Sequence, residues 1–216
     1  DFASNAALPN WAAGFLGISP ALAGLVLAGV LGGGLIVWAL AGPEFLRFDN
    51  LLAGFGVGAL IVAMWWLSGY MGYVAEHPKT LEETFLATNS GRMEALSFVA
   101  PIAYTVDWLI LFSDTTKLLT LGIVSVFGMV VGSALYSLRS RGFRWEGFHD
   151  TEDTANHLVG AVLMGVGGVT AMGCTVGQGL SGISTLSATS FVAVAAIIAG
   201  SVAALKYQVW RLELSA

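Results

Sequence analysis

The sequence contains few charged residues. Asp, Glu, Lys and Arg make up 11% of its 216 residues, against about 25% in an ordinary soluble domain. Hydrophobic residues make up 56%, and the mean hydropathy is +0.78. A soluble fold needs a charged surface, and this chain has too few charges to build one. The charges are grouped at 43–50, 76–94, 139–153 and 206–213. Such grouping is typical of membrane proteins, because a charge at bilayer depth costs about 2.5–3.5 kcal/mol.

Other features are also scarce. The net charge is −5 and no basic stripe exists, which argues against nucleic-acid binding. The single cysteine, Cys174, excludes an internal disulfide and a multi-thiolate zinc site, so we expect no metal and no cofactor. The chain starts at Asp1 without the basic region and cleavage site of a signal peptide. We therefore expect it to be part of a longer protein.

Apolar stretches predict membrane-spanning helices. About 20 apolar residues cross a bilayer as a helix, and four stretches qualify: 18–40, 51–74, 118–138 and 188–210. We predict that the chain is an all-α, polytopic integral membrane protein that contacts the lipid bilayer directly.

Three further segments are less regular. Residues 94–112 are apolar but interrupted by Pro101, and we interpret them as a kinked span or a re-entrant element. The polar stretch 81–88 is predicted to form a short surface helix. A further helix is predicted over 157–172, capped by Asp153 or Thr154.

The distribution of Lys and Arg predicts the orientation. If 94–112 crosses the membrane fully, the two sides hold unequal numbers of these residues. One side has Lys79, Arg92, Arg139, Arg141, Arg144, Lys206 and Arg211, and the other has Arg47 and Lys117. We therefore expect the loop 139–156 and the C-terminus to face the cytoplasm. If 94–112 only re-enters, part of this count changes sides.

Residues 160–187, GAVLMGVGGVTAMGCTVGQGLSGISTLS, are the segment most suggestive of function. Their eight glycines disfavour a regular helix by about 1 kcal/mol each. Broken backbone inside a membrane requires protein or water to satisfy its polar groups. Half-helices that meet at such a break direct their N–H groups and positive dipole ends to the bilayer midplane. The pattern predicts an anion site in a broken, half-helix or re-entrant segment.

The predicted anion pathway combines the polarizable thiol of Cys174 with neutral hydrogen-bond donors. Such donors could replace the water around an anion step by step without binding it as tightly as cationic side chains would. The residues of this pathway are Gly173, Cys174, Thr175, Gly177, Gln178, Gly179, Ser181, Ser184 and Thr185. Glu94 and Asp107 are secondary candidates by their depth, although Glu94 could cap a helix and Asp107 could lie near the interface. Alternatively, the glycines are helix-packing contacts and the thiol is an inert core group.

Several long motifs resemble one family. The stretch GCTVGQGLSGISTLS, preceded by RGFRWEGFHDTEDTANHLVGAVLMGVGGVTAMG and followed by KYQVWRLE, resembles the YeeE/YedE sulfur-transport family of bacterial inner-membrane proteins. The stretch GYMGYVAEHPKTLEETFLATNSGRMEALSFVAPIAY is similar to the middle region of that family. The resemblance covers residues 48–216, whereas residues 1–47 fit only as an extra membrane helix and loop. We therefore expect these two parts as domains.

The resemblance implies passage of thiosulfate or a related sulfur anion into the cytoplasm. Family members are expected to form an hourglass-shaped pathway from two inverted halves, with a cysteine in each Gly-rich constriction relaying the anion by S–H hydrogen bonds. Cys174 matches the cysteine of the second half. The first half has no counterpart here, so the chain looks like one half of an inverted-repeat transporter. The implied partners are the missing N-terminal half or a companion subunit, and a TusA-like cytoplasmic sulfur carrier.

Two other functions remain open at this point. The chain could be a non-transporting membrane subunit that its glycines pack into a larger complex. It could also be a sulfur-transfer enzyme with Cys174 as nucleophile, but such an enzyme needs an activating base. No histidine lies near Cys174 in the sequence, so we expect a transporter rather than an enzyme.

Overall fold

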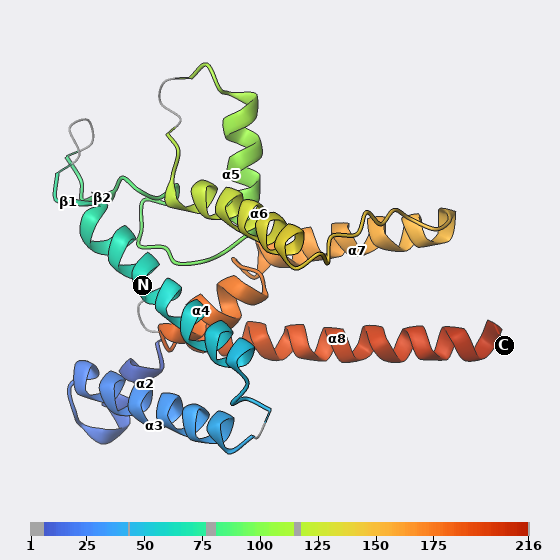
Figure 1. Cartoon of the computed structure of the whole chain (residues 1–216). Helices are drawn as coiled ribbons and strands as arrows, with labels where there is room; N and C mark the ends of the chain where they lie inside the picture. The colour runs from blue at the N-terminus through green and yellow to red at the C-terminus, as the bar shows by residue number, and fades with distance from the viewer. Residues whose placement is uncertain (1–6, 43, 77–80, 115–117, 216) are drawn as a thin grey trace. The chain divides into compact units, whose positions relative to one another are not determined.

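The chain is mostly helical in the computed structural model, which describes residues 7–42, 44–76, 81–114 and 118–215 (Figure 1). It divides into two compact units. The first consists of Asp1–Ala59 together with Gln178–Ala216, and the second is Leu60–Gly177.

Four helices are long and apolar enough to cross a membrane. They are α3 (Pro20–Ala41), α4 (Phe48–Trp66) with its π-helical continuation η1 (Leu67–Met71), α6 (Leu121–Arg139) and α8 (Ala188–Ser215). In the most apolar part of each, only 6–17% of residues are buried within the protein. Such exposed apolar surface is unfavourable in water but favourable in hydrocarbon. The four predicted spans are thus confirmed as apolar helices of spanning length.

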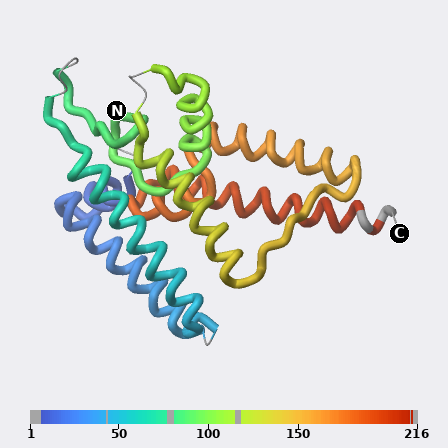
Figure 2. The backbone as a smooth tube through the Cα atoms, turned by 45° about the horizontal axis from the view of Figure 1, so that its top comes forward, coloured from blue at the N-terminus to red at the C-terminus, as the bar shows by residue number. Residues whose placement is uncertain are grey.

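In the first unit, helix α2 (Leu8–Leu16) packs against α3, and the two run side by side in Figures 1 and 2. Gly17 ends α2 in the left-handed conformation, with φ of 66°. Ser19 then caps α3 by accepting a hydrogen bond from the Leu22 N–H at 3.4 Å. The Leu8 N–H donates to the Leu186 carbonyl at 3.0 Å, which ties α2 to the residues that precede α8.

In the second unit, the segment 94–112 forms only the 12-residue helix α5 (Val99–Ile110). At 1.5 Å per residue it is about 18 Å long, which is too short to cross about 30 Å of hydrocarbon. Pro101 lies in its first turn, where proline is well tolerated because the first N–H groups have no helical partner. Pro101 therefore lies at the start of a short helix, and the alternative of a kinked span is wrong, whereas the re-entrant element stays a prediction.

Residues near 81–88 form a β-hairpin. Strand β1 (Tyr73–Val74) pairs antiparallel with β2 (Thr84–Phe85), and the rings of Tyr73 and Phe85 lie 5.3 Å apart. The prediction of a surface helix here is wrong, because a cross-strand aromatic pair stabilises the extended conformation instead.

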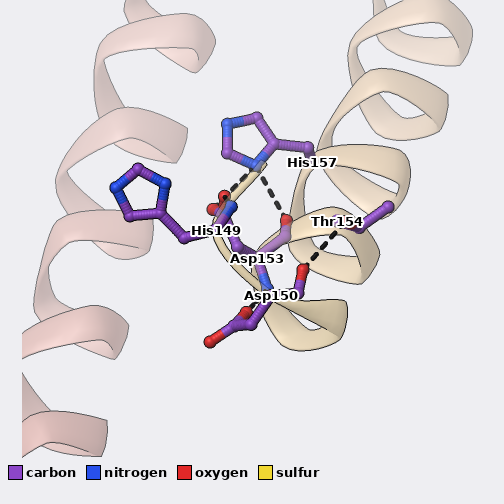
Figure 3. Close-up of polar contacts among 5 residues, drawn as sticks. All are labelled: His149, Asp150, Asp153, Thr154 and His157. Atoms are coloured by element: carbon purple, nitrogen blue, oxygen red, sulfur yellow. Dashed lines mark hydrogen bonds and ion pairs between the residues drawn. The ribbon is translucent and has the colours of Figure 1, made fainter. Parts of the chain in front are cut away.

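Helix α7 (Thr151–Thr170) begins six residues earlier than the predicted start at residue 157. Its cap is Asp150, whose Oδ1 accepts a hydrogen bond from the Asp153 N–H at 2.6 Å. The prediction of Asp153 or Thr154 as the cap is wrong. Both residues lie in the first turn, where Thr154 Oγ1 donates to the Asp150 carbonyl at 2.8 Å (Figure 3).

The core of the second unit holds the start of α5 in place. Ile61, Met64 and Leu96 are buried together. Beside them, the Ser68 side chain is completely buried; its hydroxyl donates to the Glu94 carbonyl at 2.7 Å and accepts from the Glu94 N–H at 3.2 Å. These two hydrogen bonds connect η1 to the non-helical segment that precedes α5.

Candidate functional site

The glycine-rich segment interrupts the helix. Helix α7 ends at Thr170, and the Gly173 N–H donates to the Gly168 carbonyl at 2.8 Å. Helical winding resumes at Thr175 and includes the π-helix η2 (Gly177–Gly182) before α8 begins. The high density of glycine, which disfavours regular helix, accounts for this break.

Cys174 lies at the break and is half-buried. It directly precedes the helical turn that starts at Thr175, and its Sγ interacts with the backbone N–H groups of Gly177 and Val176. The thiol therefore lies at the N-terminal end of this short helical segment, where nearby backbone N–H groups favour negative charge on the sulfur.

A second helix begins at the same sulfur. The backbone N–H groups of Phe98 and Val99, at the start of α5, also interact with Cys174 Sγ. Each helix N-terminus carries about +0.5 elementary charge from its aligned peptide dipoles. Two such ends thus meet beside one sulfur, and this arrangement favours negative charge there without a cationic side chain.

Two glycines permit the close approach of these segments. A Cβ on Gly177 would lie 2.8 Å from Ser97 Oγ, and a Cβ on Gly168 would lie 2.7 Å from Cγ2 of Val99. Both distances are shorter than van der Waals contact, so a side chain at either position requires Ser97 or Val99 to move. Sequence reasoning missed Ser97, although a serine shortly before an apolar run with proline in its first turn is a typical helix start.

The predicted pathway residues are divided between the two units. Gly173, Cys174, Thr175 and Gly177 belong to Leu60–Gly177, whereas the other five belong to the unit containing Gln178–Ala216. Gly173 is buried and Thr175 is exposed.

In the other unit the polar groups mostly bind one another. Gln178 Oε1 accepts from Ser190 Oγ at 2.6 Å, Ser184 Oγ donates to the Ser181 carbonyl at 2.6 Å, and Thr185 Oγ1 donates to a carbonyl of its own turn at 2.8 Å. The side chains of Ser184 and Thr185 thus stabilise the local backbone here. Ser181 is buried, and Gly179 lies within η2.

The two acidic candidates lie in different surroundings. Glu94 is half-buried, and its Oε1 accepts from the Ser90 N–H at 3.3 Å. Asp107, also half-buried, lies eight residues beyond Val99 in α5, which is about 12 Å along the helix axis. Asp107 is therefore not part of the cluster of N–H groups around Cys174. Among the described residues, no group of three or more His, Cys, Asp or Glu side chains could hold a metal ion.

Comparison with known proteins agrees with the membrane architecture. Over 95 residues, 44% of this chain, the sequence is 35% identical to the thiosulfate transporter TsuA of Escherichia coli (strain K12). The match covers 26% of that relative's own length. No solved structure matches significantly. The sequence pattern described as "Sulphur transport" matches residues 4–203, and so extends into the first 47 residues. The chain is a membrane protein that belongs to the sulphur transport (YeeE/YedE) family.

Proposed function

We propose that this chain forms one half of a bacterial inner-membrane passage through which thiosulfate or a related sulfur anion enters the cytoplasm, relayed by Cys174. The observation that carries the proposal is the close approach of the start of α5 to the broken segment at Gly168 and Gly177, beside the thiol of Cys174, where backbone N–H groups favour negative charge. Membership of the family and the partial similarity to a thiosulfate transporter support the choice of substrate.

The chemistry of the cluster suits a transient anion site. Backbone N–H groups and a thiol are neutral donors, and they replace part of the hydration shell of an anion as it enters. A Lys or Arg cage would bind the same anion more strongly and release it more slowly. The thiol is also polarizable, which suits the terminal sulfur of thiosulfate. We propose Gly173, Thr175 and Gly177 as further lining of this passage.

The passage needs more protein than this chain. The aligned relative is about four times as long as the stretch it shares with the chain, since the match covers 26% of it. We propose that a second half or a companion subunit completes the pathway, and that a TusA-like carrier accepts sulfur at the cytoplasmic end. The residues of the other unit, Gln178, Gly179, Ser181, Ser184 and Thr185, are proposed as the continuation of the pathway.

A sulfur-transfer enzyme is less well supported. A cysteine nucleophile needs a base within hydrogen-bonding reach. His157 lies 13 residues before the last residue of α7, which is about 20 Å along the helix, and His149 precedes α7 altogether. His77 lies outside the described residues.

Uptake of radiolabelled thiosulfate, in cells that lack their own thiosulfate transporters, tests the proposal. A hydrogen bond to a charged group contributes about 1.5–3 kcal/mol, so Cys174→Ala should slow uptake roughly 10- to 150-fold. Cys174→Ser should give an intermediate rate, because its hydroxyl donates but is less polarizable. Ser133→Ala, which removes a hydroxyl from exposed α6 surface, is the control and should leave uptake unchanged.

Uptake must be normalised to membrane abundance. A wild-type rate for Cys174→Ala at equal abundance would refute the role of the thiol. If the wild-type chain supports no thiosulfate-dependent growth even when co-expressed with the remainder of a family member, the non-transporting subunit becomes the better hypothesis.

A further inference from the structure

The loop between α6 and α7 has a first part rich in arginine and aromatic residues and a second part rich in acidic residues. Its first part, which includes the last residue of α6, reads RSRGFRW over residues 139–145 and is here called the arginine–aromatic segment. Its aromatic side chains are exposed: Phe143 is 53% exposed and Trp145 is 91% exposed. Their rings lie 6.4 Å apart. After the segment the loop carries acidic residues as it runs in extended form to the start of α7 (Figure 2).

The acidic groups that follow mostly stabilise the start of α7. Asp150 caps the helix. Asp153 Oδ1 lies 3.0 Å from His157 Nδ1, and its Oδ2 accepts from the His149 N–H at 3.2 Å (Figure 3). Glu146 pairs with Arg144 at 3.6 Å. These carboxylates therefore have local partners, and Asp150 and Asp153 also lie at the positive end of the helix dipole.

The arginines at the end of α6 have no such partners. Within the described part of the chain, no carboxylate forms an ion pair with Arg139 or Arg141. The Arg144 side chain keeps 82% of its surface exposed despite its ion pair. The arginine–aromatic segment thus presents positive charge beside exposed aromatic rings.

The position of α6 fixes where this segment lies. The helix has 19 residues and is about 28 Å long, which matches about 30 Å of hydrocarbon. Because α6 ends at Arg139, the segment starts where the chain leaves the hydrocarbon. Trp and Arg are favoured at this depth, since the ring is partly desolvated while the guanidinium meets lipid phosphate.

We propose that residues 139–145 lie on the membrane surface and bind the phosphate groups of anionic phospholipids. The inference is independent of transport, because it rests on α6 and its loop alone. Anionic headgroups supply the negative charge that Arg139 and Arg141 do not meet among the described residues, and the interfacial layer covers the rings of Phe143 and Trp145.

The backbone conformation of Arg141 is unfavourable for an arginine, which supports a functional role for its side chain. The Gly142 N–H donates to the Ser137 carbonyl at 3.1 Å and the Arg141 N–H to the Leu138 carbonyl at 3.4 Å, which together form a Schellman motif. Arg141 occupies its left-handed position with φ of 53°. Glycine is the usual residue there because it has no Cβ, so an arginine at this position costs local stability.

The test measures how deep the loop lies in the membrane. In a Cys174→Ser background, Gly147→Cys carries a spin label, and a Cβ at Gly147 meets no atom within 4 Å. The full chain is placed in nanodiscs of phosphatidylcholine alone or with phosphatidylglycerol, and collision with oxygen and with a water-soluble nickel complex reports depth. We expect the label at headgroup depth in the anionic discs. In Arg141→Gly/Arg144→Gln it should move about 5–10 Å toward water.

Two controls separate this result from misfolding. A label at Gly132, which also has an open Cβ position and lies within α6, should remain at hydrocarbon depth in every disc and variant. Arg141→Gly alone should unfold at the same or a higher temperature than wild type. A loop label in water in both kinds of disc overturns the proposal and leaves a soluble protein as the occupant. The proposal is also overturned if the depth of the loop label is the same in both kinds of disc and does not change in Arg141→Gly/Arg144→Gln.

Discussion

Gly177→Ala is the substitution for which the structure predicts the sharpest result. The new Cβ would lie 2.8 Å from Ser97 Oγ, 3.3 Å from Ser97 Cβ and 3.8 Å from Ser97 Cα. The first two contacts are too short and the third is ordinary van der Waals contact. Overpacking of this kind destabilises a protein by about 1–3 kcal/mol. We expect Gly177→Ala to lose that much stability, and Ser97→Gly to restore most of it by removing both short contacts.

The assay is thermal unfolding of the four members of this double-mutant cycle, purified in one detergent. A favourable coupling of about 1 kcal/mol or more between the substitutions is expected for residues in direct contact. Additive effects would refute the packing argument, because the cost at Gly177 would then have a source other than Ser97.

Gly167→Ala is the matched control, since a Cβ there meets no atom within 4 Å. Gly167 lies in α7, within the same glycine-rich segment of the sequence as Gly177, and its replacement should change stability by no more than about 1 kcal/mol, in the stabilising direction. Uptake normalised to folded protein then separates two roles of Gly177. If normalised uptake falls in Gly177→Ala and returns with Ser97→Gly, the pathway depends on the same close approach that stabilises the fold.

Three further outcomes are expected. Ser68→Ala leaves the Glu94 backbone groups without their buried partner and should cost about 1–3 kcal/mol, measured as a lower unfolding temperature; an unchanged temperature would contradict this. Asp150→Ala removes the cap of α7 and should cost about 0.5–2 kcal/mol, while Asp150→Asn, which can still cap, should cost much less. Single cysteines at Ser140 and Ser215, in a cysteine-free background, should resist a membrane-impermeant thiol reagent in intact cells; rapid labelling of both would reverse the predicted orientation.

The long helices were predictable because their signal is local. An uncharged stretch such as 18–40 has only one stable conformation in hydrocarbon, in which every backbone group is satisfied within the helix, and it matches α3 closely. The shorter elements depended on contacts that lie outside any local window. The pairing of Tyr73 with Phe85 decided the hairpin, and the position of Pro101 in a first turn became clear only from where α5 begins.

The candidate site was predictable in part. The density of glycines indicated a broken helix around Cys174 and helix starts directed at an anion site. The second helix start could not be found from the pattern, because Phe98 and Val99 precede Cys174 by more than 70 residues and contribute only backbone N–H groups. Every residue type except proline has a backbone N–H, so the sequence does not reveal which of these groups lies beside the thiol. Glycines that allow this close approach also cannot be told from glycines that only pack helices together.

The backbone donors around Cys174 do not change with proton concentration. Histidine, and lysine in a buried site, can lose their charge when the surroundings or the pH change, but peptide N–H groups do not titrate under physiological conditions. The electric field that α5 and the turn after Cys174 create at the sulfur is therefore permanent. For the proposed anion passage, any variation of occupancy with pH would then arise from the thiol or from the anion, because the backbone contribution is the same in an acidic and an alkaline cell.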